Sequence, residues 1–255
     1  MSKTELASFR IKAFIIKFCF AAAALALVFI FVFSVRIKTV KIEGNTISSE
    51  EQITSSANLK SGAHMYSINK DNISAAILKA NPYVNSVTIR RKLPSTLVIT
   101  VTEDKPAFYT SSGSGFLILS KELRVLGTAD SAYELSSSGI IPVVLPPIAK
   151  AETGKKLEFE TSKGYAFNTE LIRIFTESEI AEGITSIDLS SKFDVSAVYK
   201  SKYTIVFGTY TDLEKKLKFC KKTINYLEKT MPGVAGTVYA TGTDEISFLV
   251  TGTAD

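Results

Sequence analysis

The chain has 255 residues, of which 45% are hydrophobic and 10% aromatic, so it can bury substantial cores. Its net charge of +5 comes without a basic run interleaved with aromatic residues, which argues against nucleic acid as a partner. Two cysteines and one histidine cannot supply the several closely spaced ligands of a zinc site, so we expect no metal.

The first predicted element is an apolar helix from Phe18 to Val35, which carries no charge. Its 18 residues would measure about 27 Å as a helix, close to the hydrocarbon thickness of a bilayer, about 30 Å. The head, residues 1–17, has four basic and one acidic side chain, or +3. That charge predicts a cytoplasmic head and extracytoplasmic domains. A cleaved secretory signal is the alternative, but no small-x-small site lies near the end of the apolar stretch.

Residues 36–104 predict a small domain in which two helices cover one face of a sheet. The expected elements are a strand at Val35–Ile42, a helix from Ser48 to about Asn58, a helix from Asn69 or Asp71 to Asn81, and strands at Val84–Arg90 and Thr96–Glu103. The first helix would begin with a capping box, in which Ser48 and Glu51 satisfy each other's backbone N–H groups.

Residues 105–250 predict a larger domain rich in strands. The expected elements are a hairpin at Phe116–Leu119 and Arg124–Leu126, a helix at Gly164–Glu179, strands at Ile184–Leu189, Val195–Tyr199 and Tyr203–Phe207, a lysine-rich helix, and strands at Thr237–Thr241 and Ile246–Val250. A capping box at Thr211–Glu214 would start the lysine-rich helix. Its apolar stripe favours packing on the domain's own sheet, with a short coiled coil as the alternative.

Several short motifs carry a family resemblance. They are Val40-Lys41-Ile42-Glu43-Gly44-Asn45, Asn81-Pro82-Tyr83-Val84, Arg90-Arg91-Lys92-Leu93-Pro94-Ser95-Thr96-Leu97, Ile187-Asp188-Leu189 and Tyr203-Thr204-Ile205-Val206-Phe207-Gly208. In this order, just after one predicted membrane span, they resemble the POTRA domain and following domain of the bacterial division proteins FtsQ and DivIB. The resemblance implies an α+β fold: a single N-terminal transmembrane helix, a small β-α-α-β-β POTRA domain, then a larger mixed sheet with helices on one face.

The resemblance also implies an organisation and a function. The expected parts are a cytoplasmic head (1–17), a transmembrane helix (18–35), a POTRA domain (36–104), an FtsQ/DivIB-like β domain (105–250) and a short tail (251–255). The implied function is a non-enzymatic, membrane-anchored scaffold at the division septum. Its implied partners are small coiled-coil membrane proteins like FtsB/DivIC and FtsL, and through them the septal peptidoglycan synthase.

Catalytic motifs are weak. His64 has no nucleophile or orienting acid in a recognisable pattern, and Cys19 and Cys220 are expected to be apolar fillers in different compartments. The carboxylate pairs Glu158/Glu160 and Glu177/Glu179 leave a membrane-anchored cell-wall hydrolase as one alternative function. A POTRA-type secretion or assembly factor is another. We expect no enzyme activity, no cofactor and no small-molecule substrate.

The last strands are the predicted partner-binding surface. Strands at the end of a chain often leave an edge with unpaired N–H and C=O groups, to which a partner can add a strand. The predicted contact residues are Tyr239, Ile246, Phe248, Leu249 and Val250. In the alternative interpretation, Phe248 and Val250 are core residues and Gly252 to Asp255 cap the edge.

Overall fold

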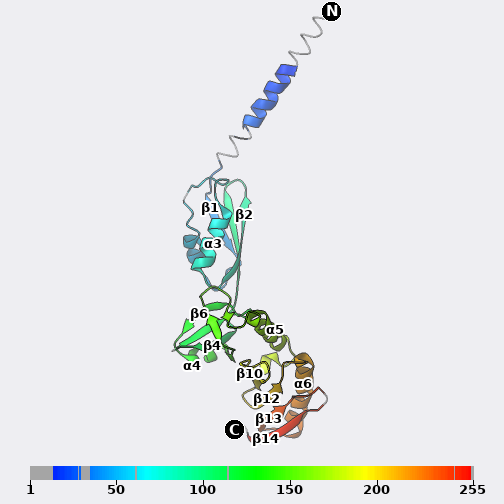
Figure 1. Ribbon diagram of the computed structural model, residues 1–255. Helices are drawn as coiled ribbons and strands as arrows, with labels where there is room; N and C mark the ends of the chain where they lie inside the picture. The colour runs from blue at the N-terminus through cyan, green and yellow to red at the C-terminus, as the bar shows by residue number, and fades with distance from the viewer. Residues whose placement is uncertain are drawn as a thin grey trace, which may run out of the picture. The chain divides into compact units, whose positions relative to one another are not determined.

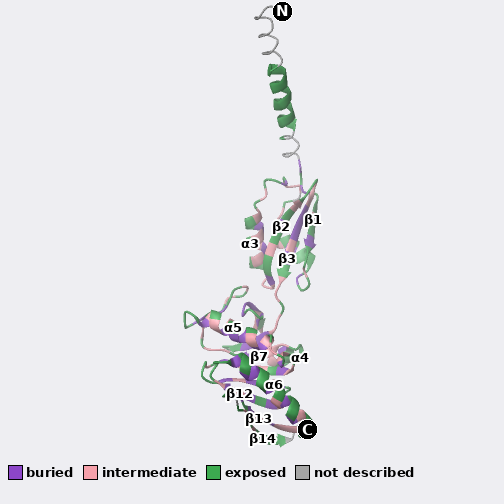
Figure 2. Ribbon diagram, turned by 90° about the vertical axis from the view of Figure 1, so that its right-hand side faces the viewer, coloured by how far each residue is buried: buried purple, intermediate pink, exposed green. Residues whose placement is uncertain are grey.

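The computed structural model describes residues 14–27, 29, 35–60, 62–113, 115–243 and 245–253. The described residues divide into two compact units, of which the first ends at Glu103 and the second begins at Asp104 (Figure 1). The first unit has a hydrophobic core in the part that follows the N-terminal helix, and the second unit has a core of its own. Buried positions lie along the strands of both units (Figure 2). The two units are therefore described separately.

Residues 14–27 form a helix whose large apolar side chains, among them Phe18 and Leu25, are exposed. Within the described ranges, every helix falls short of the length and apolarity needed to cross a bilayer. Residues 28 and 30–34 of the predicted span lie outside the described residues, as do residues 1–13 of the predicted head.

The first unit has the predicted β-α-α-β-β order. Its elements are β1 (Thr39–Glu43), α2 (Glu50–Ser56), α3 (Lys70–Ala80), β2 (Val84–Lys92) and β3 (Thr96–Glu103). The sheet order is β1-β3-β2, with β1 parallel and β2 antiparallel to the central strand. Buried side chains of α2 and α3, Ile53 and Ile77, join Leu97 and Ile99 of β3 in one core. The predicted architecture of this unit is confirmed.

Strand β1 begins at Thr39, later than the predicted start at Val35. Val35 and Ile37 are buried, as the alternating pattern predicts, but they do not pair with β3. Instead the Ile37 N–H donates to the carbonyl of Ala63, and the Met65 N–H donates to the carbonyl of Val35, each at 2.9 Å. Apolar and polar residues alternate from Val35 to Ile42 except at Thr39-Val40, and β1 begins at this interruption.

The predicted capping box at Ser48 and Glu51 is wrong by one residue. The N-cap of α2 is Ser49, whose hydroxyl accepts from the Gln52 N–H at 3.2 Å, while the Gln52 side chain accepts from the Ser49 N–H at 3.0 Å. The Ser48 N–H is already used, because it donates to the Glu103 carboxylate at 2.9 Å. A distant carboxylate on β3 therefore decides where α2 begins.

The second unit contains a nine-stranded mixed sheet in the order β14-β13-β12-β11-β10-β7-β4-β5-β6. The strands are β4 (Phe108–Ser112), β5 (Gly115–Leu119), β6 (Val125–Ala129), β7 (Ile141–Val144), β10 (Ile184–Asp188), β11 (Val195–Tyr199), β12 (Tyr203–Gly208), β13 (Val234–Tyr239) and β14 (Ser247–Thr253), and a separate ribbon pairs β8 (Ile148–Lys150) with β9 (Glu158–Phe159). The helices are α4 (Ala132–Ser137), α5 (Gly164–Thr176), the short η1 (Ala181–Gly183) and α6 (Leu213–Thr230).

Helix α6 packs on its own unit, as predicted. Its stripe of Leu213, Leu217, Cys220, Ile224 and Leu227 is buried in the core that also holds strand residues of β12 and β13. The predicted capping box at Thr211–Glu214 is wrong: the N-cap is Asp212, at a φ of 55°, and its side chain caps nothing. The buried Lys216 ammonium instead ties the helix to the sheet by donating to the carbonyls of Phe207 (2.9 Å) and Thr209 (2.8 Å).

Candidate functional site: an exposed edge strand

Strand β14 lies at one edge of the nine-stranded sheet and is the last described element of the chain (Figure 1). It pairs antiparallel with β13, from Tyr239 opposite Ser247 to Val234 opposite Thr253. The strand includes Gly252 and Thr253, so these residues extend the edge rather than cover it. Residues 254 and 255 of the predicted tail lie outside the described part of the chain.

A glycine lets β14 lie close to its neighbour. The register shifts between Ala235 and Gly236 of β13, which lie opposite Gly252 and Val250 of β14. A Cβ atom at Gly236 would lie 2.3 Å from the carbonyl oxygen of Leu249, a distance that real Cβ contacts do not show. Sequence reasoning missed Gly236, although a glycine inside a strand often marks a bulge or close backbone approach.

The five predicted contact residues divide into two groups. Tyr239, Leu249 and Val250 are 38%, 55% and 54% exposed, so their side chains are accessible from solvent. Ile246 and Phe248 are partly buried and pack against the core. The Phe248 ring meets Tyr203 edge to face, with centroids 6.1 Å apart. Phe248 therefore anchors β14, and the alternative core interpretation holds for Phe248 but not for Val250.

The two edges of the sheet differ in their protection. At the β6 edge, the Val125 N–H donates to the carbonyl of Lys155 (2.9 Å) and the Gly154 N–H donates to the carbonyl of Val125 (2.7 Å). Within the described residues, β14 has no neighbour other than β13 and carries no charged residue and no proline. Natural proteins usually block a sheet edge with charges, proline or a covering segment. The β14 edge lacks these devices and can accept a further strand.

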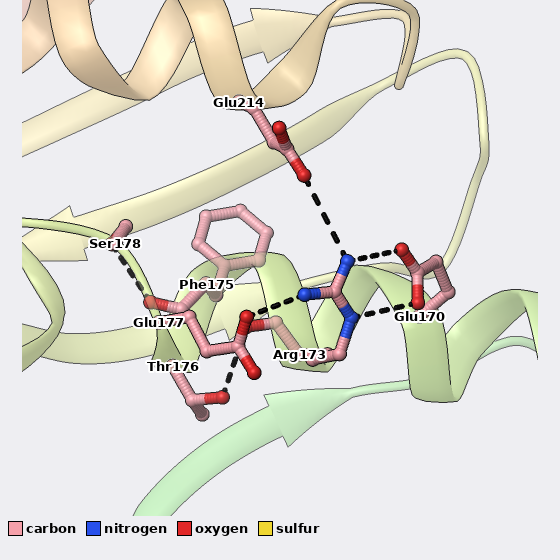
Figure 3. Close-up of polar contacts among 7 residues, drawn as sticks. All are labelled: Glu170, Arg173, Phe175, Thr176, Glu177, Ser178 and Glu214. Atoms are coloured by element: carbon pink, nitrogen blue, oxygen red, sulfur yellow. Dashed lines mark hydrogen bonds and ion pairs between the residues drawn. The ribbon is translucent and has the colours of Figure 1, made fainter.

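Glu177, one member of a predicted carboxylate pair, is part of an ion-pair network. Figure 3 shows the Arg173 guanidinium of α5 between Glu170, Glu177 and Glu214. It donates twice to Glu170, at 2.9 and 2.6 Å, and once to Glu177, and lies 3.8 Å from Glu214. The hydrogen bonds from Arg173 lower the pKa of Glu170. Glu177 is thus engaged by Arg173, four residues before it in the chain.

The other candidate reactive residues in the described part of the chain include Cys220 and His64. Burial raises the pKa of the Cys220 thiol to about 12, so almost no thiolate is present near pH 7. His64 is exposed, and its backbone forms an isolated antiparallel β-bridge with Arg36. Its carbonyl accepts from the N–H and the hydroxyl of Ser67. These residues do not form a nucleophile and base arrangement.

Comparison with known proteins agrees with this architecture. Residues 35–104 match the family model described as "POTRA domain, FtsQ-type". A protein named "Cell division protein DivIB" from Clostridium acetobutylicum is 27% identical over 71% of this chain and 70% of its own length. One of the same name from Clostridium botulinum (strain Loch Maree / Type A3) is 26% identical over 82% of this chain and 79% of its own.

Residues 35–104 thus belong to the FtsQ-type POTRA domain family, and the chain is similar over most of its length to proteins named for cell division. The two alignments span 184 and 208 residues, so each is longer than the first unit and extends into the second. A protein named "Cell division protein FtsQ" from Streptomyces venezuelae is 29% identical over 38% of this chain and 36% of its own. The exposed β14 edge thus lies in the larger unit, which follows the POTRA domain along the chain.

Proposed function

We propose that this protein is a non-enzymatic, membrane-anchored scaffold of the bacterial division complex. The similarity to proteins named for cell division supports this proposal, as does an FtsQ-type POTRA domain followed by a unit with an open sheet edge. A scaffold needs surfaces that bind other proteins, and both features suit that purpose.

The proposed location is the cell membrane at the septum, with the N-terminus cytoplasmic and both units extracytoplasmic. The uncharged stretch from Phe18 to Val35 and the +3 head before it support an anchor in this orientation. Such an anchor would confine both units to the membrane surface. Confinement raises their effective concentration toward other membrane-bound division proteins without requiring a strong individual contact.

The proposed docking surface is β14, and its unprotected edge is the observation that carries the proposal. A partner segment would add a strand beside β14, with backbone hydrogen bonds supplying affinity. The exposed side chains of Leu249 and Val250, with Tyr239 on β13, would supply selectivity. The proposed partners are small coiled-coil membrane proteins like FtsB/DivIC and FtsL, which would connect this scaffold to the septal peptidoglycan synthase.

Charge placed on the edge tests this assignment. The Leu249→Lys/Val250→Lys double variant of the full chain should lose co-purification with the FtsB/DivIC-like and FtsL-like pair, because lysine on an edge strand opposes strand addition. Thr128→Lys on β6 is the matched control, because Thr128 is exposed at the protected edge of the same sheet. Equal recovery of the partners with both variants would place the docking surface elsewhere.

A further inference from the structure

A cavity of about 520 Å³ lies in the second unit, away from β14 in the sheet order. Strand β7 pairs parallel with β10, and β11 runs antiparallel to both β10 and β12, so β7, β10 and β12 share one direction. Residues that follow these three strands line the cavity: Pro146 after β7, Ser190–Phe193 after β10, and Tyr210 after β12. The carboxyl ends of parallel strands are where sheets with helices commonly bind ligands.

The N-terminus of α5 gives the cavity an anion-binding end. The first turn of α5 lines the cavity, has no side-chain cap and contains no acidic residue. The N–H groups of Tyr165 and Ala166 have no acceptor among the described residues. Lys163 and Lys192 line the same cavity, and neither forms an ion pair with a described carboxylate. Free helix N–H groups beside two ammonium groups favour a bound anion.

One side chain that lines the cavity has a buried hydrogen-bond acceptor for which the described residues supply no donor. Asn168 of α5 lines the cavity and is 1% exposed. Its amide nitrogen donates to the carbonyl of Gly164 at 2.9 Å, but its Oδ1 has no partner among the described residues. A buried acceptor without a donor is destabilising, so such groups usually find one. A ligand that only accepts hydrogen bonds would leave this oxygen unpaired.

Aromatic rings form the apolar part of the cavity. Phe167 and Tyr210 meet edge to face, with centroids 4.9 Å apart and ring planes at 90°. Phe193 is 66% exposed, which is unusual for a large apolar ring in a turn between two strands. The Lys192 ammonium lies over the Phe193 ring, 4.9 Å from its centroid. The apolar surface and the cationic group therefore lie side by side.

We propose that this cavity binds the carboxyl-terminal residue of a partner protein. The α-carboxylate takes the free N–H groups of α5 and the ammonium groups of Lys163 and Lys192. The amide N–H of the same terminal residue, adjacent to its carboxylate, donates to Asn168 Oδ1. Its side chain packs on the rings of Phe193 and Tyr210. A terminal residue combines an anion, a neighbouring donor and an apolar group, and capture of a free carboxylate by backbone N–H groups is a known recognition mode.

A pair of peptide pools tests the proposal on the purified full chain in detergent. One pool holds random octapeptides with a free carboxyl terminus, and the other holds the same sequences with a carboxyl-terminal amide. We expect the free-acid pool to bind at least tenfold more tightly than the amide pool, with apolar residues selected at the last position. Equal binding of the two pools, or binding of neither, would overturn the proposal.

Charge reversal locates the binding in the cavity. Lys163→Glu/Lys192→Glu should lower free-acid binding at least tenfold, while Lys222→Glu/Lys229→Glu, with the same change in net charge on exposed positions of α6, should leave it unchanged. Phe193→Ser should weaken the preference for an apolar last residue. Equal losses in both charge-reversal variants would refute the site, and binding of inorganic phosphate without any peptide binding would refute the peptide assignment. The site is separate from β14, so failure here leaves the proposed scaffold function untouched.

Discussion

Glu103 organises the start of helix α2, and its removal should loosen that part of the POTRA domain. The carboxylate accepts from the N–H groups of Thr46 (2.6 Å), Ile47 (2.7 Å) and Ser48 (2.9 Å), and from the Thr46 hydroxyl at 3.0 Å. Partial burial by itself would raise the pKa of Glu103. Hydrogen bonds from Ser48, Ile47 and Thr46 outweigh that effect and lower the pKa from 4.5 to about 2.

The pKa shift sets the size and the pH range of the effect. A difference of about 2.5 pKa units corresponds to about 3 kcal/mol, and solvent screening at this partly exposed site reduces the expected contribution to about 2 kcal/mol. Because the pKa is lower in the folded state, the stabilisation is fully present well above pH 4.5. It is lost as the pH falls from 4.5 toward 2.

The substitution Glu103→Gln should remove most of this stabilisation at pH 7, because the amide presents a donor group to backbone N–H donors. We expect hydrogen exchange at the amides of Thr46, Ile47 and Ser48 to become about 30-fold faster, which corresponds to about 2 kcal/mol. Glu182→Gln, at an exposed carboxylate of the second unit, is the control. Unchanged protection in Glu103→Gln, or wild-type protection factors at pH 3 equal to those at pH 7, would refute the reasoning.

Three further predictions concern the second unit and the membrane topology. Gly236→Ala should detach β14 from β13 and lower the free energy of unfolding by about 1–3 kcal/mol, because the new Cβ would collide with the Leu249 carbonyl. Unchanged thermal stability and unchanged hydrogen exchange at the β14 amides would contradict this. Lys216→Met should cost about 1–3 kcal/mol in urea unfolding, because it leaves the buried carbonyl of Phe207 and the partly buried carbonyl of Thr209 without their donor. A neutral effect would show that water replaces the ammonium. In single-cysteine variants of intact cells, an impermeant reagent should label position Ser162 but not Ser2, and the reverse pattern would overturn the proposed orientation.

The architecture of the POTRA domain could be predicted because local signals agreed with the packing. Of the two expected N-caps of α3, Asn69 and Asp71, the structure uses Asn69, and the C-cap is Asn81, the expected end. Ile73 and Ile77, which lie about one turn apart, are both buried. The start of α2 could not be predicted, because two adjacent serines offer the same cap and a carboxylate 55 residues away selects between them. Such long-range contacts leave no local pattern.

The candidate edge was predicted only in part. Alternation and chain position indicated a terminal strand near Ile246–Val250, and β14 covers Ser247–Thr253. The residues that face the core could not be separated from those that face solvent, because the register shift between Ala235 and Gly236 interrupts the alternation. The protection of the opposite edge was also unpredictable, because it depends on the segment around Lys155, which comes from another part of the chain.

The central claim is that a partner strand pairs with β14, and a proline scan tests it most directly. Consecutive N–H groups of a strand point to opposite sides, so one of Leu249→Pro and Val250→Pro removes an outward N–H while keeping the pairing with β13. Circular dichroism identifies the variant that stays folded. We predict that this folded variant, and a truncation after Asp244 that stays folded, fail to co-purify the FtsB/DivIC-like partner. Full recovery of the partner by both would contradict docking at β14 and shift attention to the POTRA domain.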